Sequence, residues 1–362
     1  MGGNFLFRFF PVPRYLKMPA VGIDISDRSI KYVEMEKVGG FLRLKKFGDK
    51  KVEKRAVEKG EVKQKEILIE TLRLIEKETN NKFVIASLPE EKAFLKIVRL
   101  PLMSRSQIRK SLELQLEEIV PFSPADIVYD FEIVKNPSKK DSLEIALSAF
   151  PREIIEDYVE IFEKAGFIPV VFELETQSLF RAVVEPDCKD AVMVIDFGKT
   201  RTSFLVGEES VVKFGSTVSV AGENIDNALA KKLNLSIFEA EELKKKKILR
   251  KTEEGGDFEV ILPVVSVIKD EIAEVSNYWQ TYAEEQGFKN KEIKKIILCG
   301  GDANMPGLTD YLSYGSSRPV EAANPWVNIF SFENYVPEME HRESFMYATA
   351  IGLALRNFLR EV

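Results

Sequence analysis

The sequence predicts an α/β fold made of two similar lobes, with a small subdomain inserted into the first lobe. Short strands alternate with amphipathic helices along most of the chain, an order typical of the α/β class. A unit of strand, aspartate, turn and two further strands occurs twice, with its aspartates at Asp24 and Asp196. Such a duplication predicts two lobes of the same design. Between the two copies, a strand–helix–strand–strand order predicts the inserted subdomain.

The first lobe is expected to comprise residues 21–90 and 165–191, after an N-terminal extension of residues 1–20. β-branched and aromatic residues fill three short runs, and Gly39-Gly40 stands where a hairpin turn would join the last two. Apolar residues at helical spacing follow these runs. The expected elements are strands at 21–25, 30–35 and 41–47, a helix at about 64–79 and a strand at 83–88.

Residues 91–164 are expected to form the inserted subdomain. Ser104 and Gln107 have the spacing of a capping box and open a helix that Pro121 stops. Asn136-Pro137-Ser138 is expected to form the turn between the last two strands. The expected elements are a strand at 94–100, the capped helix, strands at 127–134 and 143–149, and a helix that ends near residue 166.

The second lobe is expected over residues 192–342, and a closing helix within residues 343–362 is expected to pack back on the first lobe. Its first three strands repeat the start of the first lobe, and helices follow them. The expected elements are strands at 192–196, 203–206 and 211–214, helices at about 222–233, 236–250 and 264–286, a strand at 291–299 and the closing helix from about 343 to 359.

Composition excludes several classes of function. The 362 residues carry 52 Lys and Arg against 58 Asp and Glu, a net charge of −6, which argues against a dedicated nucleic-acid binder. With one histidine, His341, and two cysteines, Cys188 and Cys299, the chain cannot form a His-rich or four-cysteine metal site. Two isolated cysteines suit a reducing compartment, so we expect a cytoplasmic protein.

The N-terminal extension contains a short aromatic run from Phe5 to Phe10, interrupted by Arg8. A membrane span needs about 18 apolar residues, so this run is too short to cross a bilayer. No small-residue cleavage site follows it, which argues against a signal peptide. The run either packs on its own domain or contacts a membrane surface or a partner.

The first candidate site is the stretch from Asp196 to Thr202, which has the form Asp-x-Gly-x-x-x-Thr. A strand-end carboxylate can hold Mg²⁺ through water, and a glycine such as Gly198 lets the backbone approach a phosphate closely. The Thr202 hydroxyl and the N–H groups of the turn can donate to phosphate oxygens. The alternative is an ordinary hairpin turn that uses Asp and Gly for geometry.

Three further segments complete a candidate nucleotide site. Asp24 is a second strand-end carboxylate, and Lys31 could grip the nucleotide from the opposite side or lie on the surface of a strand. Gly300-Gly301 follows an apolar strand and offers a bare backbone surface for a nucleoside, or else a tight turn. Glu241 and Lys244 share one helix face and could contact ribose and base, or form a solvated ion pair.

Taken together, these segments resemble the actin-like ATPase superfamily, whose lobes have a ribonuclease H-like fold. Within it the sequence is most similar to the PilM family of type IV pilus assembly, and FtsA is a more distant relative. The resemblance covers residues 21 to about 358. The matching segments are Gly22 to Lys31, Leu100 to Phe122, Val192 to Thr202, Leu298 to Leu312 and Tyr347 to Arg356.

The resemblance implies Mg-ATP in a cleft between the lobes. By position it implies nucleotide contacts at Asp24, Ser26, Lys31, Asp196, Gly198, Thr202, Glu241, Lys244, Gly300 and Gly301. Asp24 and Asp196 would hold Mg²⁺ through water, and Glu175 matches the position of a water-orienting acid. The family's first phosphate motif reads Asp-Ile-Gly, whereas this chain has Ser26 at the third position. A Cβ there either narrows the phosphate pocket or forces a different turn, which counts against ATP binding and more strongly against hydrolysis. From the resemblance we expect ATP binding with weak or no hydrolysis.

The resemblance also implies partners. PilM-like proteins bind the short cytoplasmic tail of the inner-membrane protein PilN, in a groove between the first lobe and the inserted subdomain. An extended peptide docking beside the inserted sheet fits that description. The chain would then lie at the inner membrane through this partner, together with other pilus platform proteins. The alternatives are a nucleotide-free scaffold, an FtsA-like protein that self-associates into filaments, and a metabolic phosphotransferase.

Overall fold

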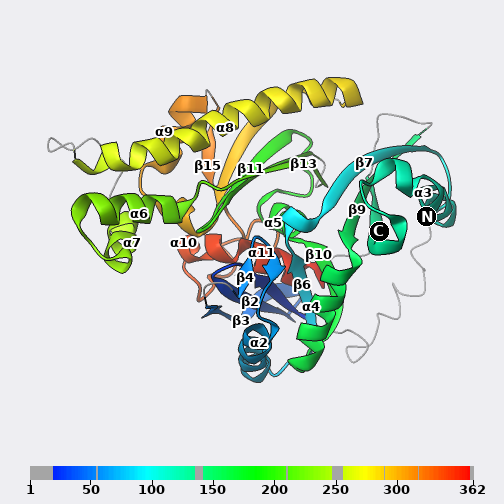
Figure 1. Cartoon of the computed structure of the whole chain (residues 1–362), viewed down its shortest axis with the longest axis horizontal. Helices are drawn as coiled ribbons and strands as arrows, with labels where there is room; N and C mark the ends of the chain where they lie inside the picture. The colour runs from blue at the N-terminus through cyan, green and yellow to red at the C-terminus, as the bar shows by residue number, and fades with distance from the viewer. Residues whose placement is uncertain are drawn as a thin grey trace.

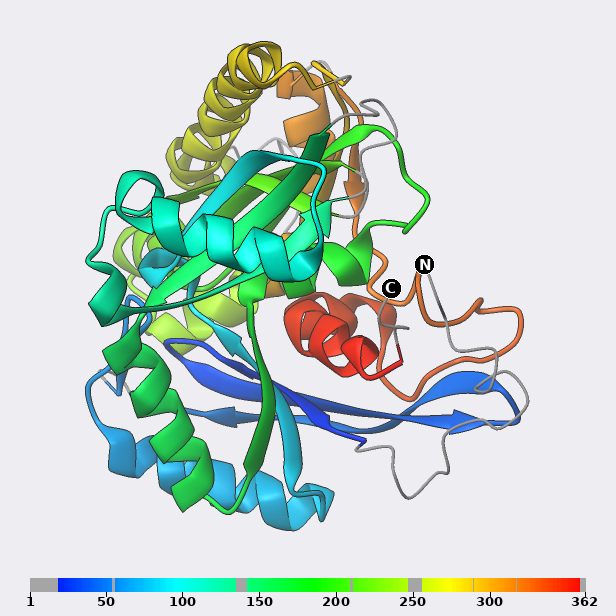
Figure 2. The same cartoon turned by 90° about the vertical axis from the view of Figure 1, so that its right-hand side faces the viewer.

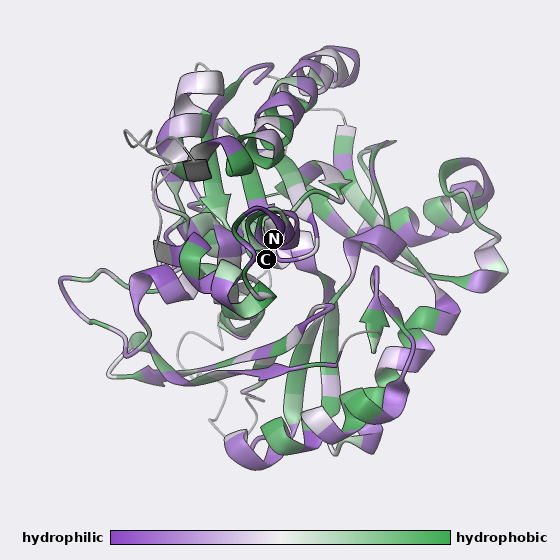
Figure 3. Cartoon of the chain, turned by 60° about the vertical axis from the view of Figure 1, so that its left-hand side comes forward, coloured by the Kyte–Doolittle hydropathy of each residue, from purple (hydrophilic) through white to green (hydrophobic). Residues whose placement is uncertain are grey.

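The computed structural model describes residues 19–53, 56–134, 142–208, 211–246, 256–288, 290–316 and 318–358. Two lobes are each built on a five-stranded mixed sheet, and a three-stranded sheet stands beside them (Figure 1). Apolar residues follow the central strands of both lobes (Figure 3). The predicted two-lobed α/β fold with an inserted small sheet is confirmed. The aromatic run of the N-terminal extension and the turn at 136–138 lie outside the described residues.

The first lobe has the strand order β10-β6-β1-β2-β3. β1 pairs antiparallel with β2 and parallel with β6, so the two sequence-adjacent strands form a hairpin in the middle of the sheet. Helices α2 and α4 bury their apolar sides against this sheet. The elements are β1 Val21–Ile25, β2 Ser29–Val38, β3 Phe41–Lys51, the small hairpin β4 Val57–Glu58 and β5 Glu61–Val62, α2 Lys65–Thr79, β6 Phe83–Leu88, α4 Arg152–Lys164 and β10 Ile168–Leu174.

The second lobe has the order β13-β12-β11-β14-β15, which repeats the pairing of the first lobe: two antiparallel contacts and then two parallel ones. α8 continues through Pro263, so the helix expected from residue 264 begins at Gly256. Ile261 and Val265 are buried on either side of that proline, and their packing keeps the helix continuous. The elements are β11 Ala191–Phe197, β12 Thr202–Glu208, β13 Val211–Val218, α6 Gly222–Leu233, α7 Ile237–Lys246, α8 Gly256–Gln286, β14 Ile293–Cys299, α9 Leu308–Ser316 and β15 Val320–Ala322. Of the helix expected at 236–250, residues 247–250 lie outside the described part.

The inserted subdomain is a sheet of order β7-β9-β8 with α3 on one face. The Ser104–Gln107 capping box is present, with the Ser104 N–H donating to Gln107 Oε1 at 2.8 Å. Apolar residues of α3 and of all three strands form a core separate from those of the lobes. The elements are β7 Phe94–Pro101, α3 Arg105–Ile119, β8 Ile127–Val134 and β9 Ser142–Pro151.

The chain end differs from the prediction. Instead of one helix over 343–359, a short α10 (His341–Ser344) and a 3-10 turn, η5 (Phe345–Tyr347), precede α11 (Ala348–Arg356). The interruption allows Phe345 and Tyr347 both to be buried, which a regular helix of this sequence would place on different faces. The prediction of a single closing helix is therefore wrong, although its second half is helical.

Helices α11 and α5 (Glu175–Val183) lie side by side between the two large sheets (Figures 1 and 2). Their backbones approach closely, since a Cβ added to Gly352 would lie 1.9 Å from the carbonyl oxygen of Ser178. The Ser178 hydroxyl donates to the Thr349 carbonyl at 2.8 Å. α11 also packs directly on β1, where Gly22 leaves no room for a side chain. This pair of helices places Glu175 at the boundary between the lobes.

No helix in the described part of the chain is both long and apolar enough to cross a membrane.

Candidate functional site

The two repeated hairpin turns meet across the boundary between the lobes. The Thr200 hydroxyl donates to Asp27 Oδ2 at 3.1 Å, and Arg28 Nη2 pairs with Glu223 Oε2 at 2.9 Å. A cavity of about 700 Å³ opens beside these contacts. Its lining residues are Asp27, Arg28, Val57, Glu58, Lys59, Glu61, Lys63, Glu91, Lys92, Thr200, Arg201, Thr217, Ser219 and Glu223. We call this cavity, with the carboxylates behind it, the interlobe cleft.

The two turns have the same hydrogen bond. Ser26 N–H donates to the Ser29 carbonyl at 3.0 Å, and Gly198 N–H donates to the Arg201 carbonyl at 3.1 Å. The Ser26 hydroxyl also donates to Ser29 O, at 2.9 Å. Among the described non-glycine residues, positive φ values occur only at 59, 80 and 234, so Ser26 forms its turn without backbone strain.

The structure brings Asp24, Lys31 and Asp196 near one another, although none of the ten suggested nucleotide contacts lines the cavity itself. Lys31 is the cross-strand partner of Asp24, and the charges of both act on Asp196. Burial raises the pKa of Asp196, Asp24 adds to this effect, and Arg201 and Lys31 oppose it. Asp24 is 8% exposed and accepts a hydrogen bond from Ser87 at 2.8 Å. Asp24 of the first lobe thus lies close enough to Asp196 of the second lobe to raise its pKa.

Thr202 is fully buried, and its hydroxyl donates to the Val220 carbonyl at 2.6 Å. The carbonyl of Gly198 accepts the N–H of Gly222 at 3.0 Å. These contacts link the second hairpin to the start of α6. The Thr202 hydroxyl, which the sequence suggested as a phosphate donor, is thus already engaged within the second lobe.

The two glycines after β14 have different surroundings. Gly300 has a φ of 97°, and a Cβ there would lie 2.4 Å from Asp196 Oδ1. At Gly301 the nearest atom to an added Cβ is 3.6 Å away, which is ordinary contact. Gly300 is therefore required for the backbone to pass Asp196, whereas Gly301 presents an open surface.

Glu241 and Lys244 have separate partners. Lys244 is 2% exposed and pairs with two carboxylates, Asp226 at 2.9 Å and Asp302. Glu241 pairs instead with Lys199 at 2.8 Å. Burial acts to raise the pKa of Glu241, but the hydrogen bond and charge of Lys199 outweigh it and lower that pKa to about 2. Lys244 is thus part of a buried charge network rather than a solvated face.

Sequence reasoning missed Arg201, which lies inside the second turn. Its Nη2 contacts Glu175 Oε1 and Oε2 at 2.8 and 2.9 Å, and its Nη1 contacts Glu91 Oε1 at 2.8 Å. Burial raises the pKa of Glu175 to about 7 although Arg201 opposes the shift. The signal in the sequence was a cation between Gly198 and Thr202, in a turn flanked by carboxylates.

A second missed residue is Glu90, in the 3-10 turn η2 (Glu90–Lys92) between β6 and β7. Burial raises its pKa to about 8, and the charges of Glu175 and Glu91 add to the shift. Its carboxyl packs against Gly215 of β13, where an added Cβ would lie 2.1 Å from Glu90 Oε1. Glu90 therefore reaches across to the second lobe.

Three carboxylates near the boundary between the lobes are available to a magnesium ion. Asp27 Oδ1 is buried without a hydrogen-bond partner, and Asp24 and Asp196 converge from opposite lobes. Among the described residues, no group of three or more His, Cys, Asp or Glu is placed to bind a metal ion directly. Coordination of Mg²⁺ through water is the mode that agrees with this arrangement.

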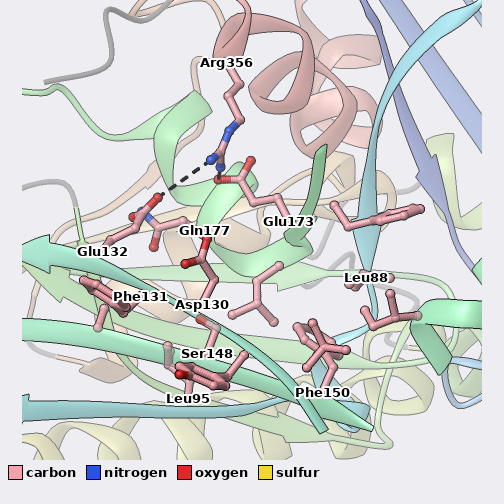
Figure 4. A pocket seen from close by; sticks show the side chains of 16 residues that line it. Leu88, Leu95, Asp130, Phe131, Glu132, Ser148, Phe150, Glu173, Gln177 and Arg356 are labelled. Atoms are coloured by element: carbon pink, nitrogen blue, oxygen red, sulfur yellow. Dashed lines mark hydrogen bonds and ion pairs between the residues drawn. The ribbon is translucent and has the colours of Figure 1, made fainter. Parts of the chain in front are cut away.

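A second cavity lies between the inserted subdomain and the first lobe (Figure 4). Because the sequence analysis expects a partner peptide between these two parts, we call it the partner groove. Its volume is about 220 Å³. Residues 128–132 of β8 form one side, and residues 172–174 of β10 form the other. The remaining lining residues are Leu88, Leu95, Ala146, Ser148, Phe150, Ile155, Gln177 and Arg356. Arg356 contacts Glu173 at 2.6 Å and Glu132 at 4.0 Å.

Comparison with known proteins agrees with this architecture. Residues 22–358 match the protein family described as "Type IV pilus assembly protein PilM". A solved "PilM-PilN type IV pilus biogenesis complex" is 22% identical with a TM-score of 0.76, and the alignment covers 95% of this chain and 100% of that chain. Ethanolamine utilization protein EutJ from Carboxydothermus hydrogenoformans is 15% identical with a TM-score of 0.55, over 93% and 89% of the two chains. MreB 5 of Spiroplasma citri bound to AMPPNP is 13% identical with a TM-score of 0.54, over 93% and 95%. These similarities show an actin-like two-lobed fold.

Proposed function

This chain belongs to the PilM family of type IV pilus assembly proteins, and from that premise we propose two ligands for its two cavities. The partner groove binds an extended segment of a PilN-like inner-membrane protein, and the interlobe cleft binds a magnesium nucleotide. The chain then acts as a cytoplasmic component of a pilus assembly platform, held at the membrane by its partner and in contact with other platform proteins.

The observation that carries the partner assignment is that two sheet edges border one groove. In the described structure β8 pairs only with β9, and β10 pairs only with β6. Five consecutive residues of β8, 128–132, line the groove. Since successive side chains of a strand point to opposite faces, a consecutive lining means that the groove runs along the strand edge. An extended peptide could therefore add its backbone hydrogen bonds to a free edge.

The chemistry of the groove indicates what such a peptide carries. Leu88, Leu95 and Phe150 give the groove an apolar part, whereas Asp130 and Glu132 add carboxylates whose side chains are 75% and 54% exposed (Figure 4). Burial and the nearby Glu173 raise the pKa of Glu132, and Arg356 opposes that shift. A peptide with apolar side chains and a neighbouring cation would satisfy both features. The PilN partner of the related solved complex motivates the choice of peptide.

The cleft assignment rests on its converging charges. Asp24 and Asp196 would hold Mg²⁺ through water, and the bound ion would neutralise phosphate charge between the two lobes. The proposed nucleotide contacts are those that the sequence suggested: Asp24, Ser26, Lys31, Asp196, Gly198, Thr202, Glu241, Lys244, Gly300 and Gly301. Glu175, the proposed water-orienting acid, is bound to Arg201 in this arrangement. Because both oxygens of this acid contact Arg201, it is badly placed to orient a water molecule. We therefore propose that ATP hydrolysis is weak or absent.

A nucleotide-free scaffold is the second candidate. Its support is that the cleft satisfies its own groups: Ser26 and Gly198 direct their N–H groups into their own turns. Lys244 is neutralised by two buried carboxylates, and Arg201 bridges the lobes without a ligand. The two lobes can therefore stay closed through their own hydrogen bonds and ion pairs, without a bound nucleotide.

Peptide binding tests the partner assignment. A fluorescent peptide of the PilN-like tail is titrated with wild type, Ser148→Trp and Ser106→Trp, and anisotropy is recorded. Ser148 lines the groove, so Trp there fills it and should weaken binding by at least about tenfold. Ser106 is exposed on α3 outside the groove and serves as the matched control. Absence of binding by folded wild type, or equal affinity of Ser148→Trp, contradicts the assignment.

Calorimetric titration with ATP and magnesium tests the cleft. Saturable one-to-one binding by wild type that is lost in Asp196→Ala supports the nucleotide site, because that variant removes a carboxylate proposed to hold Mg²⁺. No heat of binding with folded wild type favours the nucleotide-free scaffold instead.

A further inference from the structure

Arg201 joins three separate parts of the chain at the back of the interlobe cleft. It belongs to the turn between β11 and β12 of the second lobe. Its two carboxylate partners lie outside that lobe. Glu175 is the first residue of α5, and Glu91 lies in η2. The three side chains are only 14–22% exposed. Removal of the arginine would therefore leave two poorly hydrated carboxylates without their counter-ion.

Both carboxylates lie on segments that line the partner groove. Glu175 lies directly after Leu174 and two residues before Gln177. Leu174 and Gln177 both line the groove. Glu91 lies between two further lining residues, Leu88 and Leu95. The ion triad and the groove thus use neighbouring residues of the same two stretches, 88–95 and 174–177.

A second contact holds these segments to each other. The backbone N–H of Glu90 donates to Glu175 Oε1 at 3.4 Å, which is the oxygen that Arg201 also contacts. Glu175 Oε1 therefore accepts hydrogen bonds from the Glu90 N–H and from Arg201 at the same time. Arg201 adds a second link between η2 and the start of α5, since it contacts both Glu91 and Glu175.

We propose that Arg201 is a positioning residue that couples closure of the interlobe cleft to the shape of the partner groove, an inference that rests on the proposed function of the groove. When the lobes close, Arg201 holds Glu91 and Glu175 together and fixes both groove segments in register. When the lobes separate, Arg201 leaves with the second lobe and the two segments lose their common counter-ion. The closed state is then the state that binds the partner segment, because Arg201 contacts both Glu91 and Glu175 only when the lobes are closed. By linkage, a bound partner segment favours closure to the same extent.

The cleft offers a matched control for this role. Arg28 and Glu223 form another ion pair between the lobes, at 2.9 Å, and neither residue lines the groove. Loss of this pair removes an arginine contact across the same boundary without touching the groove segments. An effect specific to Arg201 is therefore separable from a general loosening of the two lobes.

Hydrogen exchange of the full-length chain tests the coupling without any ligand. Wild type, Arg201→Gln, Arg201→Lys and Arg28→Gln are compared over segments 86–96 and 168–178. We expect exchange in both segments to be at least about fivefold faster in Arg201→Gln. Arg201→Lys keeps the charge but loses the two-pronged contact, so it should give an intermediate rate, and it replaces the Gln variant if that variant does not fold. Arg28→Gln should match wild type in these segments.

Affinity for the fluorescent PilN-tail peptide gives the second measurement. We expect Arg201→Gln to bind about five- to tenfold more weakly than wild type, and Arg28→Gln to bind within about twofold of it. Unchanged exchange and affinity in Arg201→Gln would overturn the proposal. Equal effects of Arg201→Gln and Arg28→Gln would also overturn it, because they would indicate only loosened lobes. Failure of wild type to bind the peptide contradicts the proposed function, whereas the exchange rates still decide the role of Arg201.

Discussion

Replacement of Glu90 by Gln should change how the stability of this protein depends on pH. Burial, followed by the charges of Glu175, Glu91 and Asp196, raises the pKa of Glu90 to about 8 against the opposing charge of Arg201. The folded chain therefore keeps a proton that the unfolded chain releases near pH 4.5. Because the pKa is raised on folding, this contribution to stability is complete below pH 4.5 and is lost as the pH rises through 8. Gln has the shape of the protonated carboxyl and does not titrate.

The size of the effect follows from the two pKa values. Each unit of pH between the unfolded and folded pKa removes about 1.4 kcal/mol of stability for one group. Between pH 6 and pH 8 the wild type should therefore lose roughly 2 kcal/mol more than Glu90→Gln, with allowance for partial titration near pH 8. Glu175, whose pKa is about 7, titrates in the same direction in both proteins. The difference between the two proteins isolates Glu90.

Urea unfolding at pH 6, 7 and 8, followed by tryptophan fluorescence, measures this difference. Trp279 and Trp326 are both fully buried in the second lobe, against which Glu90 packs at Gly215. Glu58→Gln changes an exposed carboxylate on β4 and should follow the wild-type pH dependence. The reasoning is refuted when the unfolding free energies of wild type and Glu90→Gln change in parallel from pH 6 to pH 8.

Two further predictions concern residues that the sequence suggested for nucleotide contacts. Lys244→Met should lower the free energy of unfolding by about 3–5 kcal/mol, because Asp302 loses its cation and the buried Asp226 keeps only Lys199. Lys245→Met, at a side chain 55% exposed, should cost no more than about 1 kcal/mol in the same urea titration. Gly300→Ala should destabilise the protein by more than about 2 kcal/mol and displace Asp196, since its φ is 97° and its Cβ would meet that carboxylate. Gly301→Ala has room for its methyl group and should unfold at a temperature close to that of wild type, and similar melting of the two alanine variants would contradict this account.

Local patterns were sufficient to predict the duplicated hairpins. An aspartate at a strand end, a turn residue two positions later and a returning β-rich run define the same two-residue loop in both lobes. The register confirms this, with Asp24 opposite Lys31 and Asp196 opposite Ser203. The capping box at Ser104 was predictable for the same reason, because its partners are three residues apart. These features depend on neighbours in sequence.

The partners of the cleft residues could not be predicted in this way. Lys244 lies 18 residues after Asp226 and 58 before Asp302, and only the packing of α6 and α7 beside the end of β14 brings the three together. The same holds for Arg201 and Glu91, which lie 110 residues apart. The sequence indicates which residue types could contact a nucleotide. It does not indicate which other residues they pair with, because those pairs form only when distant parts of the chain pack together. The interrupted closing helix was missed because the burial of Phe345 and Tyr347 outweighed helical continuity.

The two candidate functions of the cleft differ in what Arg201 does. In the nucleotide-free scaffold, Arg201 remains with Glu91 and Glu175 whenever the lobes are closed, and an added nucleotide leaves partner affinity unchanged. In the nucleotide-binding candidate, two outcomes are open to the arginine. When Arg201 keeps its carboxylates, a ligand that closes the cleft stabilises the partner groove, and the two ligands bind cooperatively. When Arg201 turns to a phosphate, a strong competitor for a guanidinium, the groove segments are released and the two ligands oppose each other. The sign of the change in peptide affinity on addition of Mg-ATP, measured in wild type and in Arg201→Gln, therefore reports where this side chain lies.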